Sequence, residues 1–230
     1  MACPNSKNEV LENPTPVENF EWSVLGNGTV SIKAYRGDDK NVVIPAEIDG
    51  KSVTSIGDCA FADCTSLTSI TLSDSVTSIG DYAFNNCTSL TSINIPYSVI
   101  TIGEFAFFGC KSLKSITIPG VILMGKFAFA NCESLTSITI PPSVMEISSS
   151  TFHGCKSLTS ITIPASVTLI GACAFADCKA LASINIPKSV TEIGEGAFYN
   201  CRSLTSIKLP ENVKIGEDAF LGTPLEDKYK

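Results

Sequence analysis

The sequence lacks a basic surface. Its 16 Lys and Arg residues are outnumbered by 23 Asp and Glu residues, and no cluster of five or more basic residues occurs. Binding to a phosphate backbone or to an anionic membrane relies on such clusters, so no nucleic-acid or anionic-lipid partner is expected. No apolar run approaches the roughly 18 residues of a membrane-spanning helix, so membrane insertion is not expected either.

Motifs for catalysis and metal binding are also missing. The sequence has no G-x-G-x-x-G, Walker loop, G-x-S-x-G or H-E-x-x-H motif, and its one histidine is His153. No C-x-x-C pair occurs, which argues against a structural zinc site. We therefore predict no enzyme, no cofactor and no metal. An enzyme that depends on His153 or Cys59 is the disfavoured alternative.

What the chain does have is a repeat of 22 or 23 residues. A Cys follows the recurring Phe by three residues in seven of eight units, and Thr223 takes that place in the last. One register reads C-x-S-L-x-S-I-x-I-P-x-S-V-x-x-I-G-x-x-A-F-x-x. The recurring phenylalanines are Phe61, Phe84, Phe107, Phe129, Phe152, Phe175, Phe198 and Phe220.

Two local periods occur within each unit. The stretch SLTSITL alternates polar and apolar side chains, which predicts a short strand with one face inward. A Pro ends that strand in most units because it cannot donate to a ladder. Further on, Ala83, Phe84 and Cys87 are spaced as one face of a single helical turn. A lone unit cannot bury its eight inward residues, so the units must stack.

The sequence therefore predicts an α/β fold, a solenoid with short parallel strands and short helical turns. Residues 1–17 form a polar leader or linker without the basic and apolar segments of a secretory signal. Residues 18–56 form a hairpin-like cap with the first coil, residues 57–222 the repeats, and residues 223–230 a C-terminal cap or tail. A trimmed surface protein and a cytoplasmic protein both fit this N-terminus.

The motif L-x-x-I-x-I-P-x-x-V-x-x-I-G-x-x-A-F-x-x-C resembles the BspA-like leucine-rich repeats over about residues 42 to 222. The segment GTVSIKAYRGDDKNVVIPAEIDGKSVTSIGDCAF is similar to the start of that family's repeats, with two strands around the RGDD turn. The resemblance implies a curved leucine-rich-repeat solenoid with its strands on the concave face. It also implies an extracellular or cell-surface location and binding to host or matrix proteins.

Seven of the ten cysteines fall in one column of the repeat. That column is buried in the predicted fold, so we expect reduced thiols that pack as small apolar side chains. Cys59 and Cys173 precede column cysteines by five residues and are expected to point outward. Together with Cys3, they are the candidates for reactive thiols.

The first candidate binding surface is the outward side of the strands, a regular set of hydroxyl and amide side chains on the expected concave face. Serine and threonine also suit any exposed strand, so this pattern alone does not require a ligand. The predicted residues are Ser69, Thr71, Ser92, Asn94, Ser115, Thr117, Ser137, Thr139, Ser160, Thr162, Ser183 and Asn185.

The second candidate is an aromatic strip. Tyr82, Phe105 and Phe127 hold one position in three successive units, and Phe108 lies one predicted helical turn from Phe105. Such a strip could mark an interface or could stack between coils. A third candidate is the integrin-type tripeptide Arg36-Gly37-Asp38 in the predicted hairpin turn.

These features together favour a non-catalytic protein-binding module, used for adhesion at a bacterial cell surface or after secretion. A structural spacer or self-assembly scaffold within a larger surface protein is the alternative. We expect a protein partner and favour a monomer.

Overall fold

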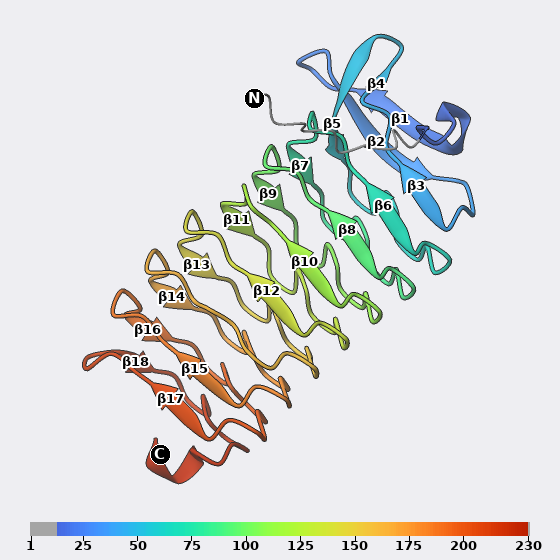
Figure 1. Cartoon of the computed structure of the whole chain (residues 1–230). Coiled ribbons are helices and arrows are strands. Elements are labelled where there is room, and N and C mark those ends of the chain that lie inside the picture. The colour runs from blue at the N-terminus through green and yellow to red at the C-terminus, as the bar shows by residue number, and fades with distance from the viewer. Residues whose placement is uncertain (1–12, 230) are drawn as a thin grey trace, which may run out of the picture.

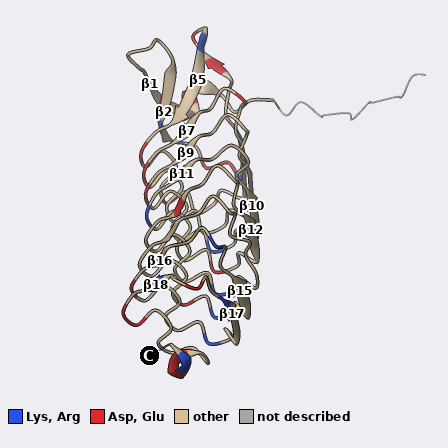
Figure 2. Cartoon of the chain, turned by 90° about the vertical axis from the view of Figure 1, so that its left-hand side faces the viewer, with Lys and Arg blue, Asp and Glu red and all other residues tan. Residues whose placement is uncertain are grey.

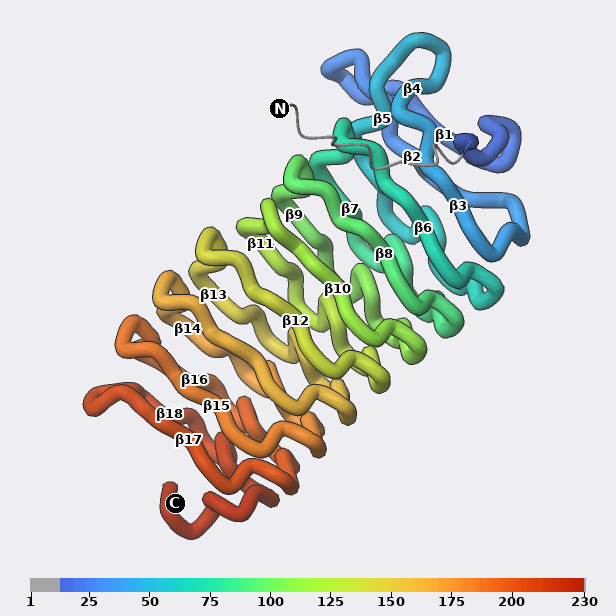
Figure 3. Tube along the Cα trace, in the orientation of Figure 1, coloured from blue at the N-terminus to red at the C-terminus, as the bar shows by residue number. Residues whose placement is uncertain are grey.

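The computed structural model describes residues 13–229, which wind into an elongated stack of coils (Figure 1). Each coil of the repeat has three faces. One carries a three-residue strand, reduced to a single bridge at residues 160–162, the second a two-residue strand, and the third only turns. Figure 3 follows the path from the N-terminal cap at one end to the last coil at the other.

The Ser/Thr face is the side of the stack that carries the longer strands. Its strands pair in parallel and in register, so that Ser69 lies opposite Ser92 and Ile70 opposite Ile93. The sheet runs from β3 to β12 and is linked by one bridge, Thr139 to Thr162, towards β15 and β17. The strands are β3 (Asn41–Val43), β6 (Ser69–Thr71), β8 (Ser92–Asn94), β10 (Ser115–Thr117), β12 (Ser137–Thr139), β15 (Ser183–Asn185) and β17 (Ser206–Lys208).

The second face carries the two-residue strands. Its parallel ladder is divided between β11 and β13, which belong to different sheets. The strands are β7 (Ser78–Ile79), β9 (Thr101–Ile102), β11 (Leu123–Met124), β13 (Glu146–Ile147), β14 (Leu169–Ile170), β16 (Glu192–Ile193) and β18 (Lys214–Ile215).

Segments that depart from the repeat close both ends, and the one at the first end runs into the opening coil. At the first end, Thr15 extends the Ser/Thr face, with its N–H donating to the Val43 carbonyl and its hydroxyl accepting from the Val43 N–H. The elements there are η1 (Val17–Asn19), β1 (Phe20–Val24), β2 (Val30–Tyr35), β4 (Glu47–Ile48) and β5 (Lys51–Ile56). At the other end lies η2 (Glu226–Lys228).

The predicted helical turns are wrong, and so is the α/β class that rested on them. The third face is a ladder of turns in which alternate N–H groups bond to the next coil. The N–H of Phe61 donates to the Ala83 carbonyl at 2.8 Å, whereas the N–H of Ala62 closes a turn to Cys59. A helix would direct all these groups along its own axis, so the chain is a solenoid of strands and turns.

Two columns of left-handed residues cause this difference. One contains Tyr82, Phe105 and Phe127, with φ of 55° to 57°. The other directly precedes the cysteine column and holds only Asn, Asp and Gly, the residues that adopt this conformation most readily. Its members are Asp63, Asn86, Gly109, Asn131, Gly154, Asp177, Asn200 and Gly222. A right-handed helical turn cannot pass through two such positions.

The core is a set of apolar columns, as the sequence predicted. The Leu, Ile, Val, Phe and Cys positions of the repeat are buried along nearly the whole stack. The phenylalanines of the repeat stack face to face, with ring centroids 5.2 to 5.8 Å apart. Tyr35 covers the first ring at 5.3 Å and Tyr229 covers the last at 4.7 Å.

The cysteine column packs behind these rings as free thiols, and no disulfide forms among residues 13–229. Each thiol from Cys87 to Cys201 donates to a phenylalanine carbonyl of the preceding coil, at 3.0 to 3.3 Å. Burial raises the pKa of Cys110, Cys155 and Cys201 to about 12. These cysteines therefore link the coils as neutral hydrogen-bond donors.

The phenylalanine column predicts the effect of a cavity. We expect Phe129→Ala to lower the free energy of unfolding by about 3–5 kcal/mol, because this ring is fully buried between two others. Urea denaturation measures the loss. Lys126→Ala, at an exposed position nearby, is the control and should stay within about 0.5 kcal/mol of wild type. Equal stabilities of the two variants would contradict the stacked core.

The thiols predict a dependence of stability on alkaline pH. Unfolding exposes thiols with pKa near 8.5, whereas the folded value is about 12 for Cys155, so the stabilising effect is complete below about pH 8.5 and is lost as pH rises towards 12. Cys155→Ser retains a donor to the Phe129 carbonyl and does not ionise in this range. Above about pH 9, wild type should lose roughly 1.4 kcal/mol per pH unit more than this variant. Parallel pH profiles in urea denaturation would refute this role for the thiol.

Candidate functional site

The Ser/Thr face displays the predicted hydroxyl and amide side chains. Eleven of the twelve predicted residues are exposed, and Ser69 is half-buried. The Ser69 hydroxyl donates to the Asn41 amide oxygen at 2.7 Å. The other eleven side chains make no hydrogen bond within residues 13–229. The repeat therefore holds a regular set of donors and acceptors outward, and their role in binding stays a prediction.

A groove at the carboxyl ends of β8, β10 and β12 was not predicted. Its volume is about 1090 Å³, and Asn94, Thr117 and Thr139 of the Ser/Thr face line one side. Four prolines and the ring of Tyr97, which is 81% exposed, make up much of the remaining lining, to which Asp74 and Ser98 also contribute. The groove therefore adds an apolar wall to one end of the hydroxyl surface.

One of the corners that line the groove is shorter by one residue. The corner after β8 reads Pro-Tyr-Ser-Val, whereas the corner after β10 reads Pro119-Gly120-Val121. Gly120 lies so close to the Tyr97 carbonyl that a β-carbon could not fit there. The shorter corner contributes Pro119 to the lining of the groove. The 22-residue step in the sequence is the signal that could have located the groove.

The aromatic strip is assembled as predicted, although no helix holds it. Phe105 stacks on Tyr82 with centroids 4.8 Å apart and on Phe127 at 4.6 Å, and Phe108 contacts it at 5.7 Å. Tyr82 is exposed and the three phenylalanines are half-buried. Much of the ring surface is thus used between coils, and an interface role for the strip stays a prediction.

The predicted hairpin around Arg36-Gly37-Asp38 is wrong. β2 pairs with β1 and β5, whereas β3 pairs with β6, so the tripeptide connects two different sheets. The Arg36 side chain forms an ion pair with Glu21 at 2.8 Å, and the Tyr35 hydroxyl donates to Asp39. The arginine is therefore engaged within the cap. Arg36 and Asp38 are both exposed, and integrin-type recognition of the tripeptide stays a prediction.

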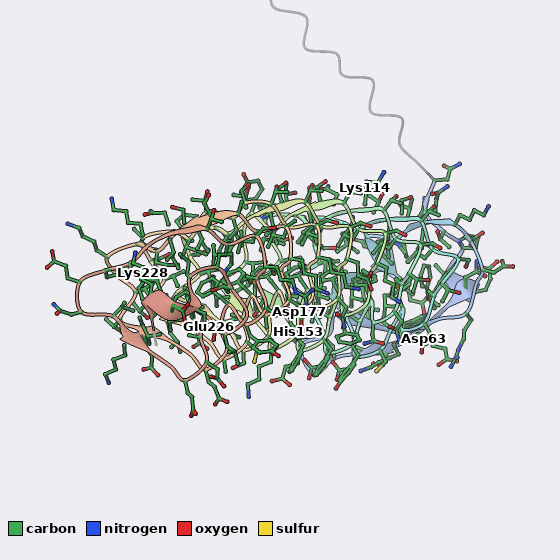
Figure 4. The ribbon with its side chains drawn as sticks, turned by 90° about the horizontal axis from the view of Figure 1, so that it is seen from below. Asp63, Lys114, His153, Asp177, Glu226 and Lys228 are labelled. Atoms are coloured by element: carbon green, nitrogen blue, oxygen red, sulfur yellow. The ribbon has the colours of Figure 1, made fainter. Side chains whose placement is uncertain are left out.

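The remaining reactive groups are scattered. Cys59 is exposed and Cys173 half-buried, while Cys3 lies outside the described residues. Burial and the neighbouring Glu195 raise the pKa of Cys173, which disfavours its thiolate. His153 lies on the side of the stack opposite Lys114 (Figure 4). Between residues 13 and 229, no group of three or more His, Cys, Asp or Glu side chains could hold a metal ion.

Charge is also dispersed, and Figure 2 shows acidic and basic residues interspersed along the coils. The described part of the chain contains no helix with the length and apolarity needed to cross a bilayer. The groove and the Ser/Thr face are therefore the main candidate binding surfaces of residues 13–229.

Comparison with known proteins agrees with this architecture. The family model for the BspA type leucine-rich repeat region matches residues 38–124 and 122–229, in six copies. The crystal structure of a leucine-rich repeat protein from T. pallidum is 33% identical with a TM-score of 0.65, over 91% of this chain and 89% of that one. A search of curated proteins found no match.

A second similar structure is that of a leucine-rich cell surface protein from Faecalibacterium prausnitzii A2-165. It is 25% identical with a TM-score of 0.63, and the alignment covers 92% of this chain and 81% of that protein. The coil pattern, the matched repeats and these neighbours lead to one conclusion. The chain belongs to the BspA-type leucine-rich repeat family.

Proposed function

We propose that this chain is a non-catalytic protein-binding module that acts in adhesion at a bacterial cell surface or after secretion. The observation that carries the proposal is the Ser/Thr face, where eleven of the twelve predicted side chains are exposed and make no hydrogen bond within residues 13–229. A partner can pair with them without first breaking contacts inside the module.

The rigidity of the face supports the same role. Its strands are in register, and the buried Ile positions between the polar columns hold each side chain at a fixed spacing. Pre-ordered side chains lose little conformational freedom on binding. The likeness to a cell surface protein supports the proposed location.

The test is binding of the purified chain to a panel of host-surface and extracellular-matrix proteins by surface plasmon resonance. Ser115→Arg with Ser137→Arg places two long cations on the Ser/Thr face and should weaken any specific binding at least about tenfold, or roughly 1.4 kcal/mol. Glu192→Arg, on the second face, is the control and should leave the affinity within about twofold. Absence of binding across the panel would argue against adhesion.

Self-assembly is the second candidate function, favoured by the exposed edge of Tyr82 in the aromatic strip. Light scattering over a concentration series tests it. Under the binding hypothesis the molar mass stays that of one chain, 24.3 kDa. A mass that rises with concentration in wild type and falls back in Tyr82→Ser would instead support a scaffold.

A further inference from the structure

On the second face, one position of the repeat that is usually threonine is apolar in three successive coils. At the position after the buried Val, four flanking coils carry threonine, namely Thr54, Thr77, Thr168 and Thr191. The coils between them carry Ile100, Ile122 and Met145, which are 46%, 45% and 64% exposed. The apolar side chains are thus confined to the middle of the stack.

The threonine hydroxyls in this column form hydrogen bonds between coils, which Ile and Met cannot form. The Thr77 hydroxyl donates to the Thr54 carbonyl at 3.1 Å, and the Thr191 hydroxyl donates to the Thr168 carbonyl at 3.3 Å. Ile and Met lose this coil-to-coil bond and expose apolar surface in its place. Packing within the chain therefore does not account for them.

Two more exposed side chains extend this surface in both directions. Leu123 follows Ile122 on β11 and is 63% exposed, and Tyr97 projects from the corner that leads to Ile100. The N–H groups of Ile122 and Leu123 both donate to the Ile100 carbonyl, which places these residues side by side. We call this surface the apolar belt, and it consists of Tyr97, Ile100, Ile122, Leu123 and Met145.

The belt joins two hollows. The groove beside Tyr97 lies at one end, and a smaller hollow of about 180 Å³ lies between Leu123 and Met145. The charged side chain lining the groove is Asp74, and the one lining the smaller hollow is Glu146. Among residues 13–229, no Lys or Arg lines either hollow. The belt is therefore aliphatic in its middle and acidic at its borders.

We propose that the apolar belt is a docking site for a protein segment that carries aliphatic side chains flanked by lysine or arginine. This inference rests on the proposed protein-binding role and names a second surface for it. The acidic borders complement a basic segment and repel an acidic one. Four of the five exposed side chains are aliphatic, which suits apolar amino acids rather than sugars, since sugars stack on aromatic rings.

The experiment uses a short fluorescent peptide in which Leu and Trp alternate with Lys, and a counterpart with Glu in place of Lys. Fluorescence anisotropy measures the affinity of the full chain for each. We expect the Lys peptide to bind at least tenfold more tightly than the Glu peptide, and Asp74→Asn to reduce that preference.

The repeat supplies the matched variant for the belt. Ile122→Thr with Met145→Thr installs the residue that the flanking coils carry, so the thermal midpoint should be maintained or raised. The same variant should weaken binding of the Lys peptide at least tenfold. Thr191→Val, at the same position in a distant coil, is the control and should bind like wild type.

Three outcomes would overturn the docking site. They are equal affinity for the two peptides, unchanged affinity in the double variant, and a wild-type dimer that this variant dissociates, which would assign the belt to a second copy. Loss of the adhesion panel signal in the Ser115 and Ser137 variant, with peptide binding intact, separates this site from the Ser/Thr face.

Discussion

The structure depends on a register constraint: each coil must place the same side chain directly over its counterpart in the next coil. Phe84 stacks over Phe61 and beneath Phe107 only because the chain returns to the same point after each turn. Backbone hydrogen bonds on all three faces, and hydrogen bonds from the thiols of the cysteine column, keep successive coils in this register. A unit shorter by one residue keeps its core only if the loss falls at a corner, as at Gly120.

The same register explains which parts of the fold could be predicted from the sequence. Inward columns were readable because burial repeats with the unit, so the Leu, Ile, Phe and Cys positions were identified correctly. The backbone of the third face was not, because an i, i+1, i+4 spacing fits a helical turn and a chain of turns equally well. The run of Asn, Asp and Gly before the cysteines distinguished them, and Asn86 and Asn131 are clear examples with φ near 55°.

The candidate surfaces were only partly predictable for a related reason. The Ser/Thr face follows the period, so its residues could be named from sequence. The groove and the apolar belt are formed by residues that differ from the repeat pattern. Whether such residues form a surface depends on which of them the fold brings together. Ile100, Ile122 and Met145 look like unrelated irregularities in the sequence, but they hold the same position in three adjacent coils. The predicted hairpin around Arg36 was wrong because tertiary packing pairs β2 with β5 and β3 with β6 rather than with each other.

The closed ends of the stack have a consequence for how such a protein behaves at high concentration. Open parallel ladders are templates for further strands and could grow into fibres. At the first end, Thr15 occupies the edge of β3 and Tyr35 covers Phe61. At the last end, Lys208 and Lys214 place charges on the edge strands β17 and β18. These features oppose head-to-tail pairing of identical molecules through their strand edges.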